Sequence, residues 1–211
     1  MQRELGLKWQ PLPALELEAA AFRADSRHEL AVAANVDGRA SYRNVGSVRR
    51  QGYELGLSGR PVAGWQLSAG FTHLLAYYRD GFTTCAAAPC VTPELRIHAG
   101  AVLPGVPRHY GSLRLQHGGD LGWRQGFGLQ AVAATYADDA HTARAAGYAL
   151  LGADLGYGWQ LAGIDRLELS ARVDNLADRH VVGSVIVNES NGRYFEPAPG
   201  RTLMLGARVV F

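Results

Sequence analysis

Apolar and polar residues alternate with a period of two along much of this chain, which is the spacing of side chains on a β-strand. In residues 166–174 the separation is complete, with Leu167 and Val173 in the apolar set and Glu168 and Arg172 in the polar set. The same alternation occurs in Glu4–Trp9, Tyr53–Ser58, Trp65–Thr72, Ser112–Gln116, Gly126–Ala133, Tyr148–Gln160 and Leu203–Phe211. The pattern indicates strands with one apolar and one polar face, as in a barrel wall between lipid and a wet lumen.

The connections between these segments alternate in length. Short turns containing Gly, Pro or Asp occur at Gln10–Ala14, Ser58–Gly64, His117–Gly122 and Leu161–Asp165, and long connections occur near Asn35–Ser47, Arg79–Pro107, Ala137–Gly147 and Leu176–Gly200. Short turns on one side and long loops on the other are typical of outer-membrane barrels. We therefore predict an all-β fold, an antiparallel transmembrane β-barrel segment. A soluble β-sandwich that acts as a binding module is an alternative, but its outward face would be polar.

Residues 14–35 leave the strand count open. Asp25-Ser26-Arg27 could form a hairpin turn, which gives ten strands, or Ala14–Ala34 could be one long strand with a bulge, which gives nine. If the chain ends on the periplasmic side, Gln10–Ala14 is a periplasmic turn only when Ala14–Ala34 is one strand. We predict nine strands.

Composition narrows the class of protein. The chain has 211 residues, of which 47% are hydrophobic and 19% charged, and its formal net charge of +2 does not suggest the strongly basic surface of a nucleic-acid-binding protein. No apolar run reaches the roughly 18 residues of a transmembrane helix, so only a barrel could span a membrane. The short spacing of Cys85 and Cys90 predicts a small disulfide loop in an oxidising compartment, with free thiols as the alternative.

Three stretches of sequence add information beyond the alternation. The first is VRRQGYEL at 48–55 followed by GWQLSAGFT at 64–72, the second is VDNLADR at 173–179, and the third is EPAPGRT at 196–202. They resemble, in this order, a strand pair, the NLxD marker of the penultimate strand and the PGR sequence before the last strand of TonB-dependent outer-membrane receptors. The third is the most specific, and the resemblance covers most of the chain from about residue 40 onward.

The resemblance implies a 22-stranded barrel in the bacterial outer membrane that encloses an N-terminal plug. Such receptors import ferric siderophores or similar scarce ligands with energy supplied through TonB, without catalysing a reaction and without a cofactor. Residues 1–211 would be the C-terminal part of that barrel, and we expect the plug domain, the TonB box and a signal peptide to be absent from them. The plug and the TonB complex would be partners only in a full-length receptor. The alternative is a small self-contained outer-membrane barrel that acts as a pore, adhesin or enzyme.

The resemblance places ligand contacts in the extracellular loops and the upper lumen. The candidates at such positions are Tyr77, Tyr78, Arg79, Asp80, Phe82, Tyr136, Arg193, Tyr194 and Phe195. Aromatic and arginine side chains suit an anionic, partly aromatic iron chelate, and they equally suit packing within the loops. The histidines form no metal-binding or catalytic motif, and Asp138 and Asp139 beside His141 are expected to be solvated, so no metal site is predicted.

The final strand has an apolar residue at every second position up to the terminal aromatic. This set consists of Leu203, Leu205, Ala207, Val209 and Phe211, whereas Thr202 and Arg208 fall on the lumen side. The pattern resembles the signal read by the machinery that assembles outer-membrane barrels. That machinery and the outer-membrane lipid are therefore expected partners.

Overall fold

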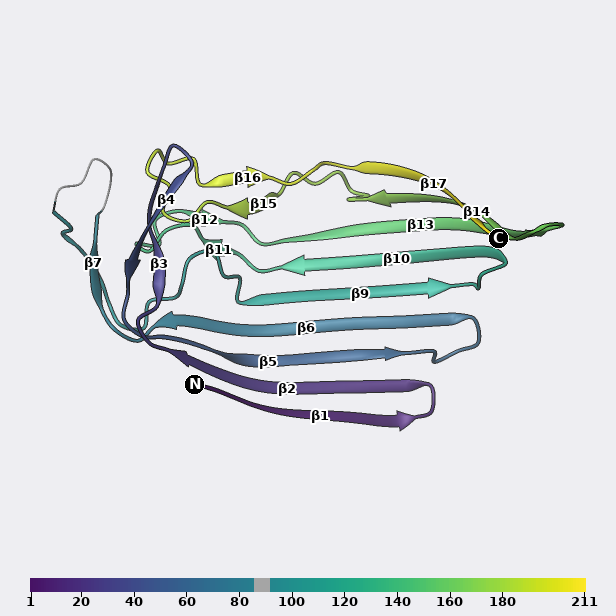
Figure 1. The fold of residues 1–211 in the computed structure, drawn as a ribbon, viewed down its shortest axis with the longest axis horizontal. Helices are drawn as coiled ribbons and strands as arrows, with labels where there is room; N and C mark the ends of the chain where they lie inside the picture. Colours follow the sequence, from purple (N-terminus) through teal and green to yellow (C-terminus); the bar gives the residue numbers. More distant parts are fainter. Residues whose placement is uncertain (86–91) are drawn as a thin grey trace.

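One antiparallel sheet of nine strands forms the body of the protein (Figure 1). The computed structural model describes residues 1–85 and 92–211, and within these residues no helix is long and apolar enough to cross a membrane. The strands, in their order across the sheet, are β1 (Gln2–Leu12), β2 (Leu15–Ser26), β5 (Val48–Gly59), β6 (Trp65–Tyr78), β9 (His109–His117), β10 (Gly122–Val132), β13 (Tyr148–Leu161), β14 (Ile164–Asp174) and β17 (Thr202–Val210). The predicted all-β fold with nine main strands is confirmed.

Short turns lie at one end of the sheet and long connections at the other, also as predicted (Figure 1). Each long connection carries a small two-stranded hairpin of its own. These hairpins are β3 (Leu30–Val36) with β4 (Arg39–Asn44), β7 (Phe82–Thr84) with β8 (Leu95–Ile97), β11 (Thr135–Tyr136) with β12 (Arg144–Ala145), and β15 (Val182–Val185) with β16 (Phe195–Pro197). In an outer-membrane barrel the end with long connections faces the cell exterior.

One part of the strand prediction is wrong, because Ala14–Ala34 is not a single strand. Strand β2 ends at Ser26, and the chain then turns away from the sheet at residues 27–29, where His28 has a φ of 56°. The alternative hairpin turn is not formed either, since Asp25 and Ser26 still pair with β5. Leu30–Val36 does form a strand, β3, but its sequence does not identify the strand with which it pairs.

The register of the sheet sorts side chains into an outer and an inner face. Phe127 of β10 lies opposite Leu115 of β9 and Ala153 of β13, and the row continues through Val173 of β14 to Leu203 of β17. Phe127 and Leu203 are 58% and 64% exposed. A continuous exposed apolar face of this kind is unfavourable in water and is the surface that lipid covers in a barrel.

The tryptophans mark one border of this apolar face. Each of the four lies within a few residues of a short turn, namely Trp9, Trp65, Trp123 and Trp159. The ring of Tyr157 lies 4.9 Å from that of Trp123 and 4.5 Å from that of Trp159. Tyrosine and tryptophan concentrate where a barrel crosses the membrane–water interface, so this row identifies the periplasmic border.

Ion pairs cross the inner face over glycines. Arg114 of β9 contacts Asp154 of β13 with 2.5 Å between the nitrogen and the oxygen. The intervening strand β10 contributes Gly126, and a Cβ there would lie only 2.7 Å from both charged groups. Arg124 and Glu168 are paired in the same way across the next strand. The glycines of the inner face therefore provide the space in which charges two strands apart meet.

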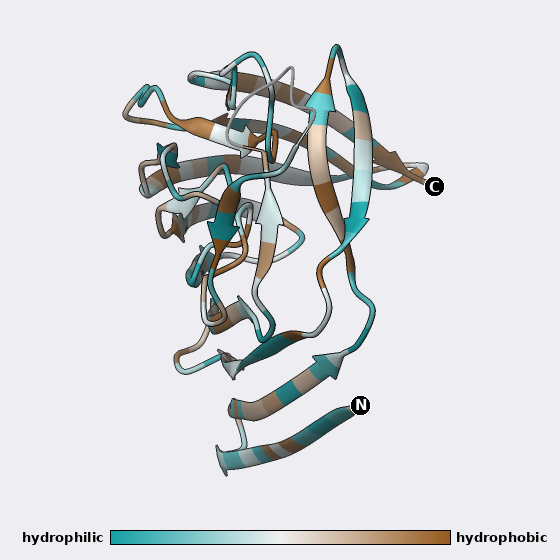
Figure 2. Cartoon of the chain, turned by 90° about the vertical axis from the view of Figure 1, so that its left-hand side faces the viewer, coloured by the Kyte–Doolittle hydropathy of each residue, from teal (hydrophilic) through white to brown (hydrophobic). Residues whose placement is uncertain are grey.

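The long connections contact one another at the outer end of the sheet (Figure 2). A small apolar core forms there from Val45, Val48, Tyr78 and Ile97. The β3–β4 hairpin reaches from the β2 side of the sheet to the connection between β14 and β17, where the backbone nitrogen of Asn35 donates to the Asn188 carbonyl at 2.9 Å. The outer end is thus a packed cap rather than a set of separate loops.

The two outermost strands of the sheet are β1 and β17, and each pairs on one side only. The residues predicted to form the barrel-assembly signal all lie on the outer face of β17 or just beyond its end. Among them, Leu205 is 77% and Phe211 is 87% exposed. Their recognition by the assembly machinery stays a prediction. The disulfide prediction also stays open, since Cys90 lies outside the described residues.

Strand β5 offers a direct test of the sheet geometry. An added Cβ at Gly52 would lie 1.9 Å from the backbone oxygen of His73, whereas at Gly56, on the same strand and face, the nearest atom is 3.5 Å away. We expect Gly52→Ala to lower the free energy of unfolding by about 1–3 kcal/mol, because the backbone of β6 must move.

The midpoint of urea unfolding in detergent micelles measures this effect, with Gly56→Ala as the matched control. Equal midpoints for the two variants would contradict the close approach of β5 and β6 at this position.

Candidate functional site

A buried carboxylate connects the long connections to one another. Asp139 is 4% exposed and accepts hydrogen bonds from the Tyr78 hydroxyl at 2.7 Å and from Nδ2 of Asn188 at 2.9 Å. It also forms an ion pair with Arg43 of β4 at 2.7 Å. Together with Asp139 itself, these three partners belong to four different segments of the chain. One side chain therefore fixes the relative positions of the connections that follow β2, β10 and β14 and of the outer end of β6.

The neighbouring Asp138 is buried as well, at 6% exposure. Its carboxylate accepts from the backbone nitrogens of Thr142 and Ala143, at 3.0 and 2.6 Å, and thereby closes the turn between β11 and β12. The expectation that Asp138 and Asp139 are solvated is therefore wrong, because each carboxylate is buried and accepts hydrogen bonds that the sequence does not reveal. Over the described ranges, no group of three or more His, Cys, Asp or Glu residues could hold a metal ion.

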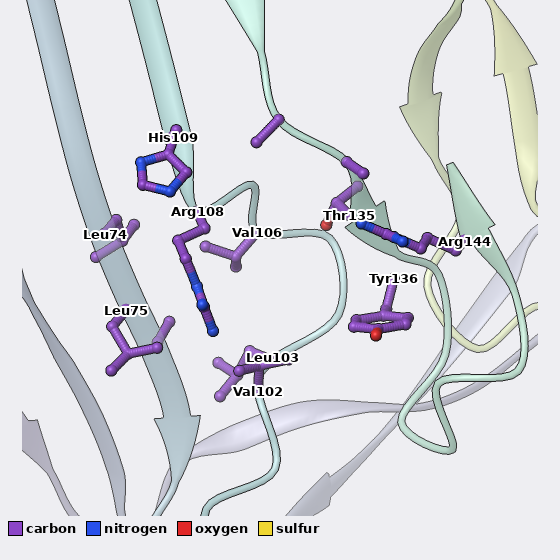
Figure 3. Close-up of a pocket in the computed structure, with 13 residues that line it drawn as sticks. Leu74, Leu75, Val102, Leu103, Val106, Arg108, His109, Thr135, Tyr136 and Arg144 are labelled. Atoms are coloured by element: carbon purple, nitrogen blue, oxygen red, sulfur yellow. The ribbon is translucent and has the colours of Figure 1, made fainter. Parts of the chain in front are cut away.

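Next to this network lies a cavity of about 270 Å³ (Figure 3). Its walls come from β6, from the segment that leads into β9, and from the β11–β12 hairpin. Two hydrogen bonds connect the last two walls: the Gly105 nitrogen donates to the Tyr136 carbonyl at 2.8 Å, and Nε2 of His141 lies 2.9 Å from the Val102 carbonyl. The cavity is thus built where two long connections meet at the outer end of the sheet.

The lining of the cavity is positively charged and partly aromatic. Arg108 and Arg144 both line it, no Asp or Glu does, and none of the ion pairs in the described part of the chain involves either arginine. Figure 3 shows Arg108 extending from the start of β9 between Leu75 and Val106, with Tyr136 across the cavity. This combination favours an anionic ligand with aromatic groups.

Two neighbouring side chains hold the Tyr136 ring in place. Its ring stacks on His141 at 4.0 Å between centroids, and the Arg144 guanidinium lies 5.8 Å from the ring centre because Tyr136 and Arg144 are directly paired across β11 and β12. The adjacent Thr135 hydroxyl oxygen is buried without a hydrogen-bond partner among the described residues. An unpartnered buried hydroxyl in the lining provides a polar group that a ligand could bind.

Tyr136 is the one predicted ligand residue that lines this cavity. Tyr78 is 1% exposed and donates to Asp139, and Phe82 packs edge-on against Tyr78 at 4.8 Å, so both belong to the apolar core of the cap. Tyr77 lies on the outer face of β6, where its hydroxyl is 3.4 Å from Nη1 of Arg49. The structure therefore separates side chains that are adjacent in the sequence.

The other predicted residues lie on the surface of the long connections. Asp80 accepts from the Ser47 backbone nitrogen at 2.7 Å, and this bond lowers the pKa of its carboxyl. Burial raises the pKa of the Tyr194 hydroxyl. Arg193 and Phe195 beside it are exposed, as is Arg79. Ligand contact by these residues stays a prediction.

Sequence reasoning did not single out Arg108, Thr135 or Arg144. Arg108 directly precedes the alternating strand that begins at His109, and Arg144 follows Tyr136 within one long connection. A basic residue at a strand end beside a long loop is a weak signal. What makes these two arginines notable is the lack of a nearby carboxylate, which only the folded chain reveals.

Asp139 is the residue whose loss should most disturb the cap. We expect Asp139→Ala to destabilise the packed connections by about 3–5 kcal/mol, because Arg43 is left as a buried charge without a partner. Hydrogen exchange of the backbone amides in β3, β4 and residues 186–190 measures this loss, with the exposed Glu94→Ala as control. Unchanged exchange in these segments would show that Asp139 does not hold the cap together.

Comparison with known proteins connects this architecture to a family. The sequence profile described as "TonB dependent receptor-like, beta-barrel" matches residues 1–176. The catecholate siderophore receptor Fiu of Escherichia coli K12 is 31% identical to the chain over 214 aligned positions, which cover 99% of the chain and 25% of Fiu. The chain thus spans about a quarter of the length of this curated relative.

Solved structures agree with the sequence match. The crystal structure of the siderophore receptor PiuA from Acinetobacter baumannii matches 98% of the chain and 28% of PiuA, with a TM-score of 0.75 and 26% identity. The closed form of the ferric-catecholate import receptor Fiu from E. coli K12 matches 98% of the chain and 27% of that protein, with a TM-score of 0.68 and 28% identity. The resemblance inferred from the sequence motifs is confirmed, and the chain belongs to the TonB-dependent receptor family of bacterial outer-membrane β-barrels.

Proposed function

We propose that this chain is the C-terminal barrel part of a receptor that carries a ferric catecholate siderophore across the outer membrane, with energy supplied through TonB. The observation that carries the ligand class is the cavity that holds Arg108, Arg144 and Tyr136 without an acidic residue. The relationship to the catecholate receptor Fiu supports the same class.

Ferric catecholates carry negative charge on aromatic rings, and the cavity offers groups for both properties. Arginine donates charge-assisted hydrogen bonds to anionic oxygens, and an aromatic ring can stack on Tyr136. At about 270 Å³ the cavity is slightly smaller than the roughly 300–1,000 Å³ of sites that enclose a whole drug-sized ligand. We therefore propose that the cavity binds one catecholate group of the siderophore rather than the whole iron chelate.

The inner face supports a transport role below this cavity. Two hollows of about 520 and 540 Å³ lie along it, lined by charged and small side chains such as Arg114, Asp154 and Glu18. Such a surface suits contact with water, a passing ligand or a plug domain and provides no apolar core of its own. Transport without bond chemistry fits this inner face better than catalysis does.

The open sheet supports the proposal that further strands complete the barrel. Strands β1 and β17 each have one unpaired edge, and an unpaired backbone group in lipid costs several kcal/mol. Both edge strands run towards the end with short turns, so closing them on each other would require a parallel pair. A small self-contained barrel, the second candidate, would need an antiparallel closure that nine strands do not provide.

The ligand assignment is tested by uptake of iron. In cells whose own catecholate receptors are deleted, the receptor that contains this chain should take up radioactive iron bound to a catecholate siderophore. Arg108→Gln together with Arg144→Gln should raise the half-saturating concentration at least tenfold, since hydrogen bonds to charged groups contribute about 1.5–3 kcal/mol each.

Arg39→Gln is the matched control, because Arg39 is an exposed arginine of the β3–β4 hairpin outside the cavity. Surface labelling should show equal amounts of each receptor. Uptake that is equally efficient in the double variant and the control would contradict the assigned site, and absence of uptake by the unaltered receptor would contradict the ligand class.

A further inference from the structure

A group of basic residues occupies the outer, lipid-side face of the sheet near its outer end. The register places Arg3 of β1 opposite Arg23 of β2 and places Asp25 opposite Arg49 of β5. All four share the face that carries Leu5, Leu17 and the other outward apolar residues of these strands. Charged side chains are rare on the lipid-facing wall of a barrel, and there they are destabilising unless they lie near an interface.

Asp25 gathers three guanidinium groups around one carboxylate. Nε of Arg49 lies 2.6 Å from Oδ1, Nε of Arg23 lies 2.9 Å from Oδ2, and Nη1 of Arg79 lies 3.8 Å from Oδ1. Asp25 is the one acidic residue at the outward positions of β1, β2, β5 and β6. Even with Asp80 beside Arg79, the three arginines outnumber the carboxylates near them, so the site keeps a net positive charge.

The remaining donors of this group are available to a ligand. Arg23 and Arg49 each make their shortest contact with Asp25 through Nε, and no hydrogen bond or ion pair among the described residues uses a terminal nitrogen of Arg23. The side chains of Arg23 and Arg79 are 49% and 46% exposed, whereas that of Arg49 is 16% exposed. A guanidinium group that is held in one orientation can donate hydrogen bonds from its remaining N–H groups to the oxygens of a phosphate.

The depth of the group in the membrane follows from the sheet. On β2 the outward apolar residues run from Leu15 beside the short turn to Ala21, and Arg23 and Asp25 are the ninth and eleventh residues counted from Leu15. A tilted strand crosses the hydrocarbon core of the membrane in about 9–11 residues, so Arg23 and Asp25 fall at the headgroups of the outer leaflet.

An aromatic row supports this placement. Tyr53 stacks on His73 with 5.1 Å between centroids, and Phe71 lies 6.1 Å from Tyr53. Tyr53 lies directly opposite Ala21, one outward position below Arg23. Aromatic side chains of this kind mark the membrane–water interface, with the arginines immediately outside it.

We infer that Arg23, Arg49 and Arg79, organised by Asp25, form a binding site for the phosphate of a lipid in the outer leaflet. In the outer membrane this lipid is the phosphorylated glycolipid lipid A. The site is separate from the loop cavity, because the two share no residue. Its occupation would hold β2 and β5 at a defined depth in the leaflet.

Retention of lipid A through purification tests the inference. The receptor that contains this chain is extracted from outer membranes in mild detergent, and bound lipid A is counted by native mass spectrometry. Arg23→Gln combined with Arg79→Gln should reduce retained lipid A at least tenfold. The control is Arg60→Gln in the short turn between β5 and β6, which removes an exposed arginine at the opposite membrane surface and should change nothing.

A second measurement uses the unaltered protein and so does not depend on the folding of variants. Its melting temperature is compared in nanodiscs that contain lipid A, enzymatically dephosphorylated lipid A, or phosphate-free lipid with added inorganic phosphate. Stabilisation by intact lipid A alone is the expected result. Equal melting temperatures in intact and dephosphorylated lipid A would overturn the proposed site, as would equal retention of lipid A by the double variant and the control. Stabilisation by inorganic phosphate alone would show that the site binds phosphate but not lipid.

Discussion

Backbone pairing in lipid is the constraint on which the rest of this protein depends. Every N–H and C=O group within the hydrocarbon layer must find a partner in a neighbouring strand, which requires long antiparallel ladders in a fixed register. That register aligns every second residue of each strand with its counterparts in the neighbouring strands, so that rows of side chains run across each face of the sheet. The row from Leu115 through Phe127 and Ala153 to Val173 is apolar and lies on the outer face, whereas Arg114 and Asp154 meet on the other face. A shift by one residue in any strand would exchange the two faces.

The sheet also determines where specific binding can occur. With the wall fixed by pairing, the long connections are the segments free to build sites, and they converge at one end. There a single buried acid, Asp139, joins Arg43, Tyr78 and Asn188 and gives the cap a defined shape. The arginine-lined cavity depends on that shape, because its walls come from two different connections. Binding in the cavity therefore rests on polar contacts between loops, supported by a rigid wall.

Much of the wall could be predicted from the sequence, and less of the cap. Period-two alternation and the alternating lengths of the connections predict nine strands and their topology, because each is a local property. The prediction fails at Leu30–Val36, which forms a strand as expected but pairs with β4 rather than with the main sheet. Asp139 is a polar loop residue in the sequence, and its burial depends on Arg43, which lies 96 residues earlier in the chain. Tyr77 and Tyr78 are neighbours in the sequence, but the strand places them on opposite faces.

This sheet spans a membrane, with one face in lipid and the other facing the lumen. Nitroxide labels at Leu151, Leu155, Gly152 and Asp154 of β13, each placed singly in a protein with Cys85 and Cys90 replaced by serine, test it most directly. Relaxation by lipid-soluble oxygen should dominate at Leu151 and Leu155, and relaxation by a water-soluble nickel chelate should dominate at Gly152 and Asp154. Equal exposure of all four labels to the nickel chelate would contradict the account, because both faces of the sheet would then lie in water.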